Sequence, residues 1–149
     1  MREKIEWMFD KGSVSEEIIK TVEEKFGVIF PANYKEIVKE NNGAQPVPDV
    51  YDFEGRKEAV MNSLLHFNLE EQGNIIDVYE KMKDRLPELV YPFANDPFGN
   101  LICFDYRNNS KNPEVVFWNH EETEGAISHI CDSFNELLFK LYDPEEQQS

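Results

Sequence analysis

The spacing of apolar residues near the start of the chain predicts an amphipathic helix. Its apolar residues recur at four-residue intervals within a charged segment: Val14, Ile18, Val22 and Phe26. This period places them along one side of a helix. Ser13 stands three residues before Glu16, which is typical of a capping box, and Ser15 is the alternative cap. Gly27 is expected to end the helix.

Two shorter helices are predicted on either side of this one. Residues 3–10 form an opening helix in this interpretation, and its apolar side consists of Ile5, Trp7, Met8 and Phe9. The other helix begins at Pro31, a residue that suits the first turn, and ends at Gly43. Its inward-facing residues are Tyr34, Ile37 and Val38.

Helical spacing returns twice later in the chain. Asn74 is expected to cap a helix that continues to about Leu86. A last helix begins near Asp132, and its apolar residues are Phe134, Leu137, Leu138 and Leu141.

Short apolar runs bounded by turn residues predict six strands. These runs are residues 47–53, 64–67, 89–94, 101–106, 114–118 and 126–130. Asp96-Pro97-Phe98-Gly99 carries Asp, Pro and Gly where a type I turn favours them, so it joins 89–94 and 101–106 as a hairpin. Asp96 is therefore interpreted as a turn residue.

The order of these elements predicts a single α+β domain. Consecutive strands favour a mostly antiparallel, meandering β-sheet, and the helices pack against it. The domain is expected to span residues 1–142, because residues 143–149 form an acidic polar tail with no apolar residues to bury. The length of 149 residues is sufficient for one hydrophobic core.

Charge narrows the range of partners. The formal net charge of −15 argues against direct binding to nucleic acid or to anionic membranes, since both present phosphate. From residue 114 to the end, nine acids face the single base Lys140. Such a field favours fast association with a basic protein. The alternative is that the acidity only keeps the protein soluble.

The sequence carries no familiar catalytic or cofactor motif. The seven glycines are too far apart for a phosphate-binding loop, and no nucleophile elbow is present. Cys103 and Cys131 lack metal or redox spacing and are expected to be buried free thiols. The start of the chain has no signal-peptide pattern, which favours a cytoplasmic protein. We therefore expect no cofactor, no bound metal and no enzymatic activity.

Weaker chemical signals remain as alternatives. A fold could bring His120 near His129, with Glu121 or Glu124, as ligands for a divalent metal. Asp96 with Asp105, or Glu121 with Glu122, are conceivable acid–base pairs. Among 30 acidic residues, however, some pairs arise by chance.

Two neighbouring aromatic residues bear on partner binding. Phe117 and Trp118 point to opposite faces of a strand, so one of them is expected to be buried and the other partly exposed. An exposed Trp118 among acids would be an anchor for a protein partner.

Three stretches resemble the SUKH superfamily in order and spacing. They are residues 24–34 closing on Asn41-Asn42-Gly43, residues 92–105, and Val115-Val116-Phe117-Trp118-Asn119-His120-Glu121 followed by the last helix. The resemblance covers roughly residues 18–141. The resemblance implies the helices and the central hairpin described above. The bacterial members of the superfamily are mostly noncatalytic immunity proteins against polymorphic toxins, and its fungal members regulate cell-wall synthesis.

The resemblance, together with the charge, predicts an immunity protein that neutralises a cognate basic toxin domain, a nuclease in the leading hypothesis. An acidic body would cover the phosphate-binding surface of the nuclease. The expected contact residues are Asp49, Asp52, Glu54, Trp118, Glu121, Glu122 and Glu124. The alternative is a noncatalytic regulatory or scaffolding module that binds host proteins. An acid–base or metal-dependent enzyme is the third hypothesis.

Overall fold

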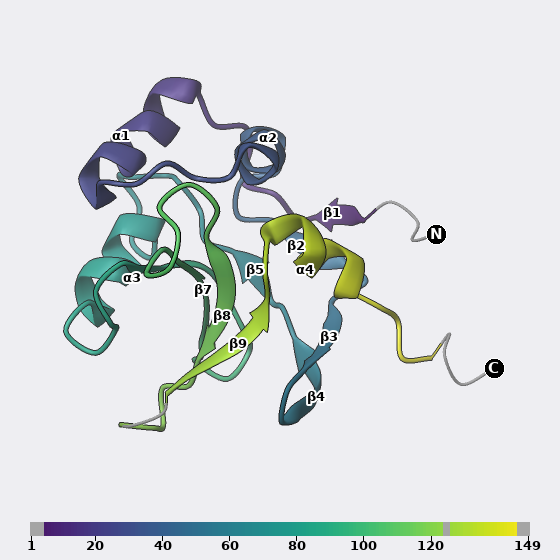
Figure 1. Ribbon diagram of the computed structural model, residues 1–149. Coiled ribbons are helices and arrows are strands. Elements are labelled where there is room, and N and C mark those ends of the chain that lie inside the picture. Colours follow the sequence, from purple (N-terminus) through teal and green to yellow (C-terminus); the bar gives the residue numbers. More distant parts are fainter. Residues whose placement is uncertain (1–4, 124–125, 146–149) are drawn as a thin grey trace.

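An antiparallel sheet of five strands forms the centre of the protein in the computed structural model (Figure 1), which describes residues 5–123 and 126–145. The strand order follows the sequence: β5 (Ser63–Leu64), β6 (Val90–Asn95), β7 (Leu101–Asp105), β8 (Glu114–Trp118) and β9 (Ile127–Cys131). All five residues of β7 are buried, because β7 is the central strand and both of its faces are covered.

Two short ribbons and four helices surround the sheet in the described residues. The ribbons pair β1 (Glu6–Met8) with β2 (Gln45–Val47), and β3 (Val50–Phe53) with β4 (Arg56–Val60). The helices are α1 (Glu16–Phe26), α2 (Ala32–Glu40), α3 (Ile75–Met82) and α4 (Phe134–Lys140). Figure 1 shows α1 and α2 above the sheet, α3 at one side and α4 in front. The prediction of a single α+β domain is confirmed.

The larger core lies on the sheet face that carries Phe104 and Phe117. Tyr34 of α2 is fully buried there, and aromatic rings surround it at centroid distances of 5.1–6.5 Å: Phe30, Phe67, Phe93, Phe104 and Phe134. Interlocking rings of this kind fix the position of α2 and α4 on the sheet.

A second core covers the opposite face. Its sheet residues include Cys103, Val116 and Trp118. They pack against Leu86, which follows α3, and against three side chains of α3: Val78, Tyr79 and Met82. Both cysteines are buried free thiols, as predicted. The helices of the described residues are too short or too polar to cross a membrane.

The predicted opening helix is wrong. Residues 6–8 form β1, which pairs antiparallel with β2 through Trp7 and Pro46. A helix of one or two turns is unstable by itself. A strand instead gains backbone hydrogen bonds from a partner that lies far away in sequence.

Details of the two N-terminal helices also differ from the prediction. Ser15, not Ser13, caps α1, since its Oγ accepts a hydrogen bond from the Ile18 amide at 3.2 Å. The buried side of α1 contains Ile19, whereas Ile18 is exposed. Gly27 ends α1 in the left-handed conformation, as predicted. The second helix ends at Glu40 with Asn41 as its C-cap, before Gly43.

Strand boundaries agree best where neighbouring strands are close in sequence. The predicted 114–118 coincides with β8, and the neighbouring predictions are within one residue of β6, β7 and β9. The predicted 47–53 is divided into β2 and β3, and the predicted 64–67 shortens to β5. The charged strand β4 was not predicted. The predicted helix from Asn74 to Leu86 ends at Met82.

Candidate partner-binding surface

The predicted acids of the β3–β4 ribbon have different roles. Glu54 lies exposed at the hairpin tip, and Asp49 lies exposed five residues earlier, before β3 begins. Asp52 is half-buried, and its Oδ1 accepts hydrogen bonds from the Glu58 amide and the Tyr142 hydroxyl, both at 2.8 Å. These bonds hold the pKa of Asp52 below its ordinary value. Asp52 therefore fastens the C-terminal segment to the ribbon.

Glu121 and Glu122 lie exposed on the connection between β8 and β9. Asn119 fixes the start of this connection, because its Oδ1 accepts from the Glu121 amide at 2.9 Å and its carbonyl accepts from the Glu122 amide at 3.2 Å. The Asn119 amide in turn donates to the Ala126 carbonyl at 2.9 Å. The third predicted acid of this loop, Glu124, lies outside the described residues.

Trp118 is not the exposed anchor that the sequence predicted. Its exposed fraction is 1%, and that of Phe117 is 2%, because a core covers each face of the sheet. The Arg85 guanidinium also lies 4.9 Å from the centroid of the Trp118 ring. A partner cannot reach this ring without displacing Arg85.

An exposed aromatic residue does lie at the same end of the sheet. Phe98, 66% exposed, stands in the turn between β6 and β7. The buried Asp96 holds this turn: its Oδ1 accepts from the amides of Phe98 and Asn100, and its Oδ2 accepts from Asn100 Nδ2, each at 2.8 Å. Asp96 is therefore a turn residue, as predicted. Phe98 is displayed on a fixed backbone.

The two connections lie side by side. Asn100 Oδ1 accepts from the His120 amide at 3.0 Å and lies 2.7 Å from His120 Nδ1, which donates because an amide oxygen only accepts. A Cβ on Gly99 would lie 3.4 Å from the His120 ring. Arg85 also donates to the His120 carbonyl. Phe98, Glu121 and Glu122 thus form one exposed group, which we name the turn-end surface.

The tip of the β3–β4 ribbon lies at the same end of the sheet. The ring centroid of Phe53 lies 5.2 Å from that of Phe117 near the end of β8, and the Arg56 guanidinium lies 4.8 Å from the centroid of the Phe117 ring. Figure 1 shows this tip and the end of β8 at the lower end of the view. Glu54, at this tip, therefore lies at the same end of the sheet as the turn-end surface, whereas Asp49 precedes the other end of β3.

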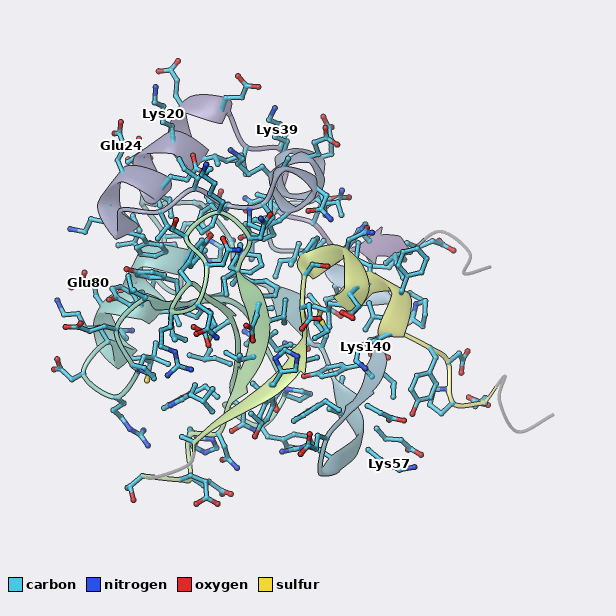
Figure 2. The ribbon with its side chains drawn as sticks, viewed as in Figure 1. Lys20, Glu24, Lys39, Lys57, Glu80 and Lys140 are labelled. Atoms are coloured by element: carbon cyan, nitrogen blue, oxygen red, sulfur yellow. The ribbon has the colours of Figure 1, made fainter. Side chains whose placement is uncertain are left out.

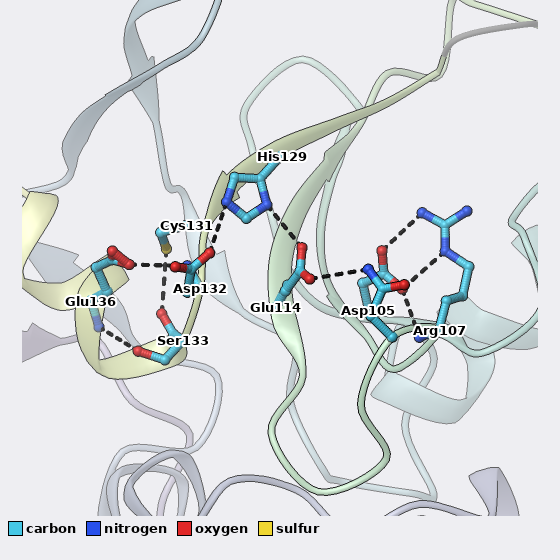
Figure 3. A network of polar contacts seen from close by, with 9 residues as sticks. Asp105, Arg107, Glu114, His129, Cys131, Asp132, Ser133 and Glu136 are labelled. Atoms are coloured by element: carbon cyan, nitrogen blue, oxygen red, sulfur yellow. Dashed lines mark hydrogen bonds and ion pairs between the residues drawn. The ribbon is translucent and has the colours of Figure 1, made fainter.

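A polar network occupies the opposite end of β7 and β8 (Figure 3). Arg107 binds Asp105 with two side-chain hydrogen bonds of 2.8 and 3.0 Å. His129 lies between Glu114, at 3.0 Å, and Asp132, at 3.1 Å. Burial, the largest single influence, raises the pKa of Asp105, but the bonds and charge of Arg107 outweigh it and lower the pKa overall.

This arrangement separates the predicted chemical pairs. Asp96 lies in the turn before β7 and Asp105 is the last residue of β7, so the two lie at opposite ends of this strand and do not form an acid–base pair. His120 contacts Asn100, whereas His129 contacts carboxylates of β8 and of the α4 entrance. Within residues 5–123 and 126–145, no group of three or more His, Cys, Asp or Glu side chains has the arrangement of a metal site.

The α1–α2 side of the molecule carries charges of both signs. Lys39 and Glu16 form an ion pair of 2.6 Å, and Lys35 lies 3.2 Å from the buried Glu23. Figure 2 shows Lys20, Glu24 and Lys39 along these helices. A groove of about 850 Å³ on this side is lined by apolar residues as well as by these acids and lysines. Its mixed charge distinguishes it from the turn-end surface.

The comparison with protein families agrees with this fold. A SUKH family model, described as SMI1-KNR4 cell-wall, matches residues 16–138, and the chain therefore belongs to this family. The chain is also 36% identical over 75 residues to the SPbeta prophage-derived uncharacterized protein YokK of Bacillus subtilis (strain 168). That match covers 46% of this chain and 33% of YokK, so it spans about a third of the length of the relative.

Sequence reasoning found the two exposed acids of the turn-end surface and missed its aromatic residue. The signal for Phe98 was present, since an apolar side chain within a Pro-Phe-Gly turn has few neighbours to pack against. Arg85 gave no such signal, because its contact with Trp118 joins residues from two distant elements.

Proposed function

We propose that this protein is an immunity protein that binds a cognate polymorphic toxin domain through the turn-end surface. The observation that carries the proposal is the exposed Phe98 beside Glu121 and Glu122, on two connections fixed by the Asn100–His120 contact. Membership of the SUKH family supports a protein as the partner. The protein would act by binding alone, with no bond made or broken.

The charge of the molecule indicates the chemistry of the toxin. A nuclease holds its phosphate substrate on a basic surface, and a protein of net charge −15 is attracted to such a surface at long range. The acids at the turn end would occupy the phosphate sites and exclude the nucleic acid. We therefore infer a basic nuclease domain, neutralised in the cytoplasm, where it would meet its substrate.

Phe98 and the acids would contribute to different steps. Exposed carboxylates mainly raise the association rate, and this effect is lost when salt screens them. A central aromatic residue that is desolvated on binding mainly slows dissociation. Because hydrogen bonds of Asp96 and Asn119 already hold the β6–β7 turn and the start of the β8–β9 connection, little conformational freedom of these parts would be lost on binding.

The experiment begins with coexpression. A candidate toxin domain, sought in the genes next to the one for this chain, is induced with and without this protein. Survival of cells only in the presence of this protein is the expected result. Association of the purified partners is then followed by stopped-flow fluorescence over a range of salt concentrations. A nuclease substrate assay establishes whether binding prevents access of nucleic acid.

Three variants separate the contributions. Glu121→Gln/Glu122→Gln should slow association at low salt and flatten its salt dependence. Phe98→Ala should speed dissociation by about tenfold or more, as expected for a binding hot spot. Glu36→Gln/Glu40→Gln removes the same charge from exposed positions of α2 and is the matched control. Equal effects of the two double variants would refute a specific role for the turn end.

A regulatory or scaffolding module is the second candidate, because the matching family model is described by the term cell-wall. In that case, coexpression would give no protection from the toxin. Neither the wild-type protein nor the turn-end variants would then bind the toxin detectably.

A further inference from the structure

The outer edge of β9 is open in the described part of the chain. β9 is the last strand of the five-stranded sheet, and no strand among residues 5–123 and 126–145 pairs with its outer side. In Figure 1, the lower half of β9 diverges from the β3–β4 ribbon. An unpaired edge presents a row of backbone donors and acceptors to other chains.

The pairing register shows which residues provide these groups. The Asn119 amide donates to the Ala126 carbonyl, which makes these two residues a hydrogen-bonded pair. Bonded and non-bonded pairs alternate in an antiparallel ladder. Ser128, opposite Phe117, therefore points its backbone groups toward β8. Ile127 and His129 consequently point their N–H and C=O groups outward.

Burial limits the open stretch to residues 127–129. Ile127 and Ser128 are half-buried and His129 is exposed, whereas Ile130 and Cys131 are buried beside the start of α4. Two outward-facing residues offer four backbone groups, enough to pair with a short extended segment.

Acidic side chains lie at both ends of this edge. The Asp132 side chain is 82% exposed and follows β9 directly, whereas Glu114, on the other side of His129, belongs to the inner neighbour β8 (Figure 3). Glu121 and Glu122 precede β9. Lys57 acts on Asp52, on the side of the β3–β4 ribbon, and Lys140 acts both on Asp52 and on Cys131, at the buried end of β9. An added strand beside His129 would therefore meet carboxylates.

We propose that the β9 edge accepts an extended, cationic segment of the protein partner as a sixth strand of the sheet. Backbone hydrogen bonds to Ile127 and His129 supply the affinity, and basic side chains of the segment pair with the exposed Asp132. This inference rests on the proposed function for the identity of the partner. It assigns to that partner a second contact, separate from the turn-end surface.

A second copy of this chain fits the edge poorly. Antiparallel pairing of two β9 strands brings Asp132 of one copy toward the Glu121–Glu122 end of the other. Each copy also carries a net charge of −15. Like charges placed opposite each other in adjacent strands are destabilising, so charge favours a cationic partner over self-association.

A defined peptide tests the edge without the toxin. The probe is an acetylated peptide of alternating Lys and Val, titrated into the 15N-labelled protein at low salt. The expected result is saturable shifts of the Ile127 and His129 amide signals, lost at high salt. The controls are the same peptide with N-methylated backbone and an alternating Glu and Val peptide. Equal shifts with the N-methylated peptide, or shifts confined to other residues, would overturn the proposal.

Variants of His129 test the edge in the toxin complex. Proline is tolerated where a strand N–H faces outward, so His129→Pro removes the outward donor and keeps the β8–β9 ladder. His129→Ala keeps the donor and removes only the side chain. His129→Pro is expected to bind the toxin domain at least tenfold more weakly than His129→Ala. Equal affinities in two variants of equal melting temperature would refute the sixth strand.

Amide exchange separates this proposal from the proposed function. In the free protein, the Ile127 and His129 amides should exchange much faster than that of Ser128, and the toxin should protect both. Toxin binding that leaves both amides unprotected would sink the edge proposal alone. Absence of any toxin binding would sink the proposed function, while the peptide titration still decides the edge. Protection that rises with protein concentration alone would instead identify a second copy as the occupant.

Discussion

The two edge strands of the central sheet differ in whether neighbouring backbone binds their outer side. At β5, the Leu64 amide donates to the Ala44 carbonyl at 2.9 Å, so a neighbouring segment closes this edge. Close by, the side chain of Asn42 accepts a hydrogen bond of 2.7 Å from the Phe67 amide. At β9, the described residues include no segment that takes up the outward groups of Ile127 and His129.

This difference distinguishes an edge that the fold needs for its stability from an edge that is available for association. Leu64 is 1% exposed, and Asn42 is completely buried, so the β5 edge is part of the core. The β9 edge instead carries exposed charged groups, which natural sheets use to discourage unwanted pairing. Such charges also select the partner that can pair. We expect substitutions at the closed edge to change stability and those at the open edge to change association.

The largest expected effect is that of Leu64→Ala at the closed edge. Removing this buried side chain should lower the free energy of unfolding by about 2–5 kcal/mol, as for other buried leucines. Ile127→Ala at the open edge should cost roughly 1 kcal/mol or less, because Ile127 is only half-buried. Urea unfolding followed by circular dichroism measures both. Equal losses would mean that the β9 edge is as much part of the core as the β5 edge.

Asn42→Ala should have the next largest effect. The substitution leaves the buried Phe67 amide without its acceptor and Asn68 Oδ1 without the donor Asn42 Nδ2. We expect a loss of about 1–3 kcal/mol, the cost of leaving buried polar groups unsatisfied. Ser128→Ala is the comparison at the open edge and should change stability by less than about 0.5 kcal/mol. A neutral Asn42→Ala would show that the edge closes without this side chain.

The sequence predicted the sheet best where its strands are neighbours in the chain. β6, β7 and β8 are joined by the local connections 96–100 and 106–113, and the Asp96 turn carries its own signal, so local patterns sufficed. β1 pairs with β2, which lies nearly forty residues later, and this pairing overrode the helical pattern of residues 3–10. No local pattern encodes such a partner.

The candidate site was predicted only in part for a similar reason. Exposure of Glu121 and Glu122 follows from their place in a polar connection. Burial of Trp118 depends on α3 and on Arg85, which cover the second face of the sheet. A strand pattern shows that two residues point to opposite faces, but it does not show that both faces are covered. Phe98 was therefore overlooked in favour of Trp118.

Asp105 links the central strand to the network beside β9 and gives a pH-dependent prediction. Its pKa in the folded protein is lowered, so it stabilises the fold above its ordinary pKa of about 3.9. This contribution is lost as the pH falls through that value and then through the folded pKa. Asp105→Asn should therefore cost roughly 0.5–1 kcal/mol at neutral pH, in the range of partly exposed ion pairs.

The measurement compares wild type with Asp105→Asn by urea unfolding from neutral pH down to strongly acidic pH. The difference between the two proteins should shrink as the pH falls. Protonation of the other carboxylates reduces charge repulsion in both proteins alike. The difference in unfolding free energy between the two proteins therefore does not contain this general effect. A difference that stays constant with pH would show that Asp105 acts through its hydrogen-bonding shape and not through its charge.

The smallest effect on stability, and a clear effect on association, is expected for Asp132→Val. Asp132 is exposed at the end of β9, so its replacement should change stability by less than about 0.5 kcal/mol. It also removes a charge that opposes pairing of two β9 edges. At about 1 M salt, where the Debye length is ~3 Å, the remaining repulsion is screened. Light scattering should then detect dimers of the variant but not of wild type. Asn62→Val beside the closed β5 edge is the matched control and should stay monomeric, because neighbouring backbone already occupies that edge. Dimers of both variants would mean that added apolar surface, and not the open edge, drives the association.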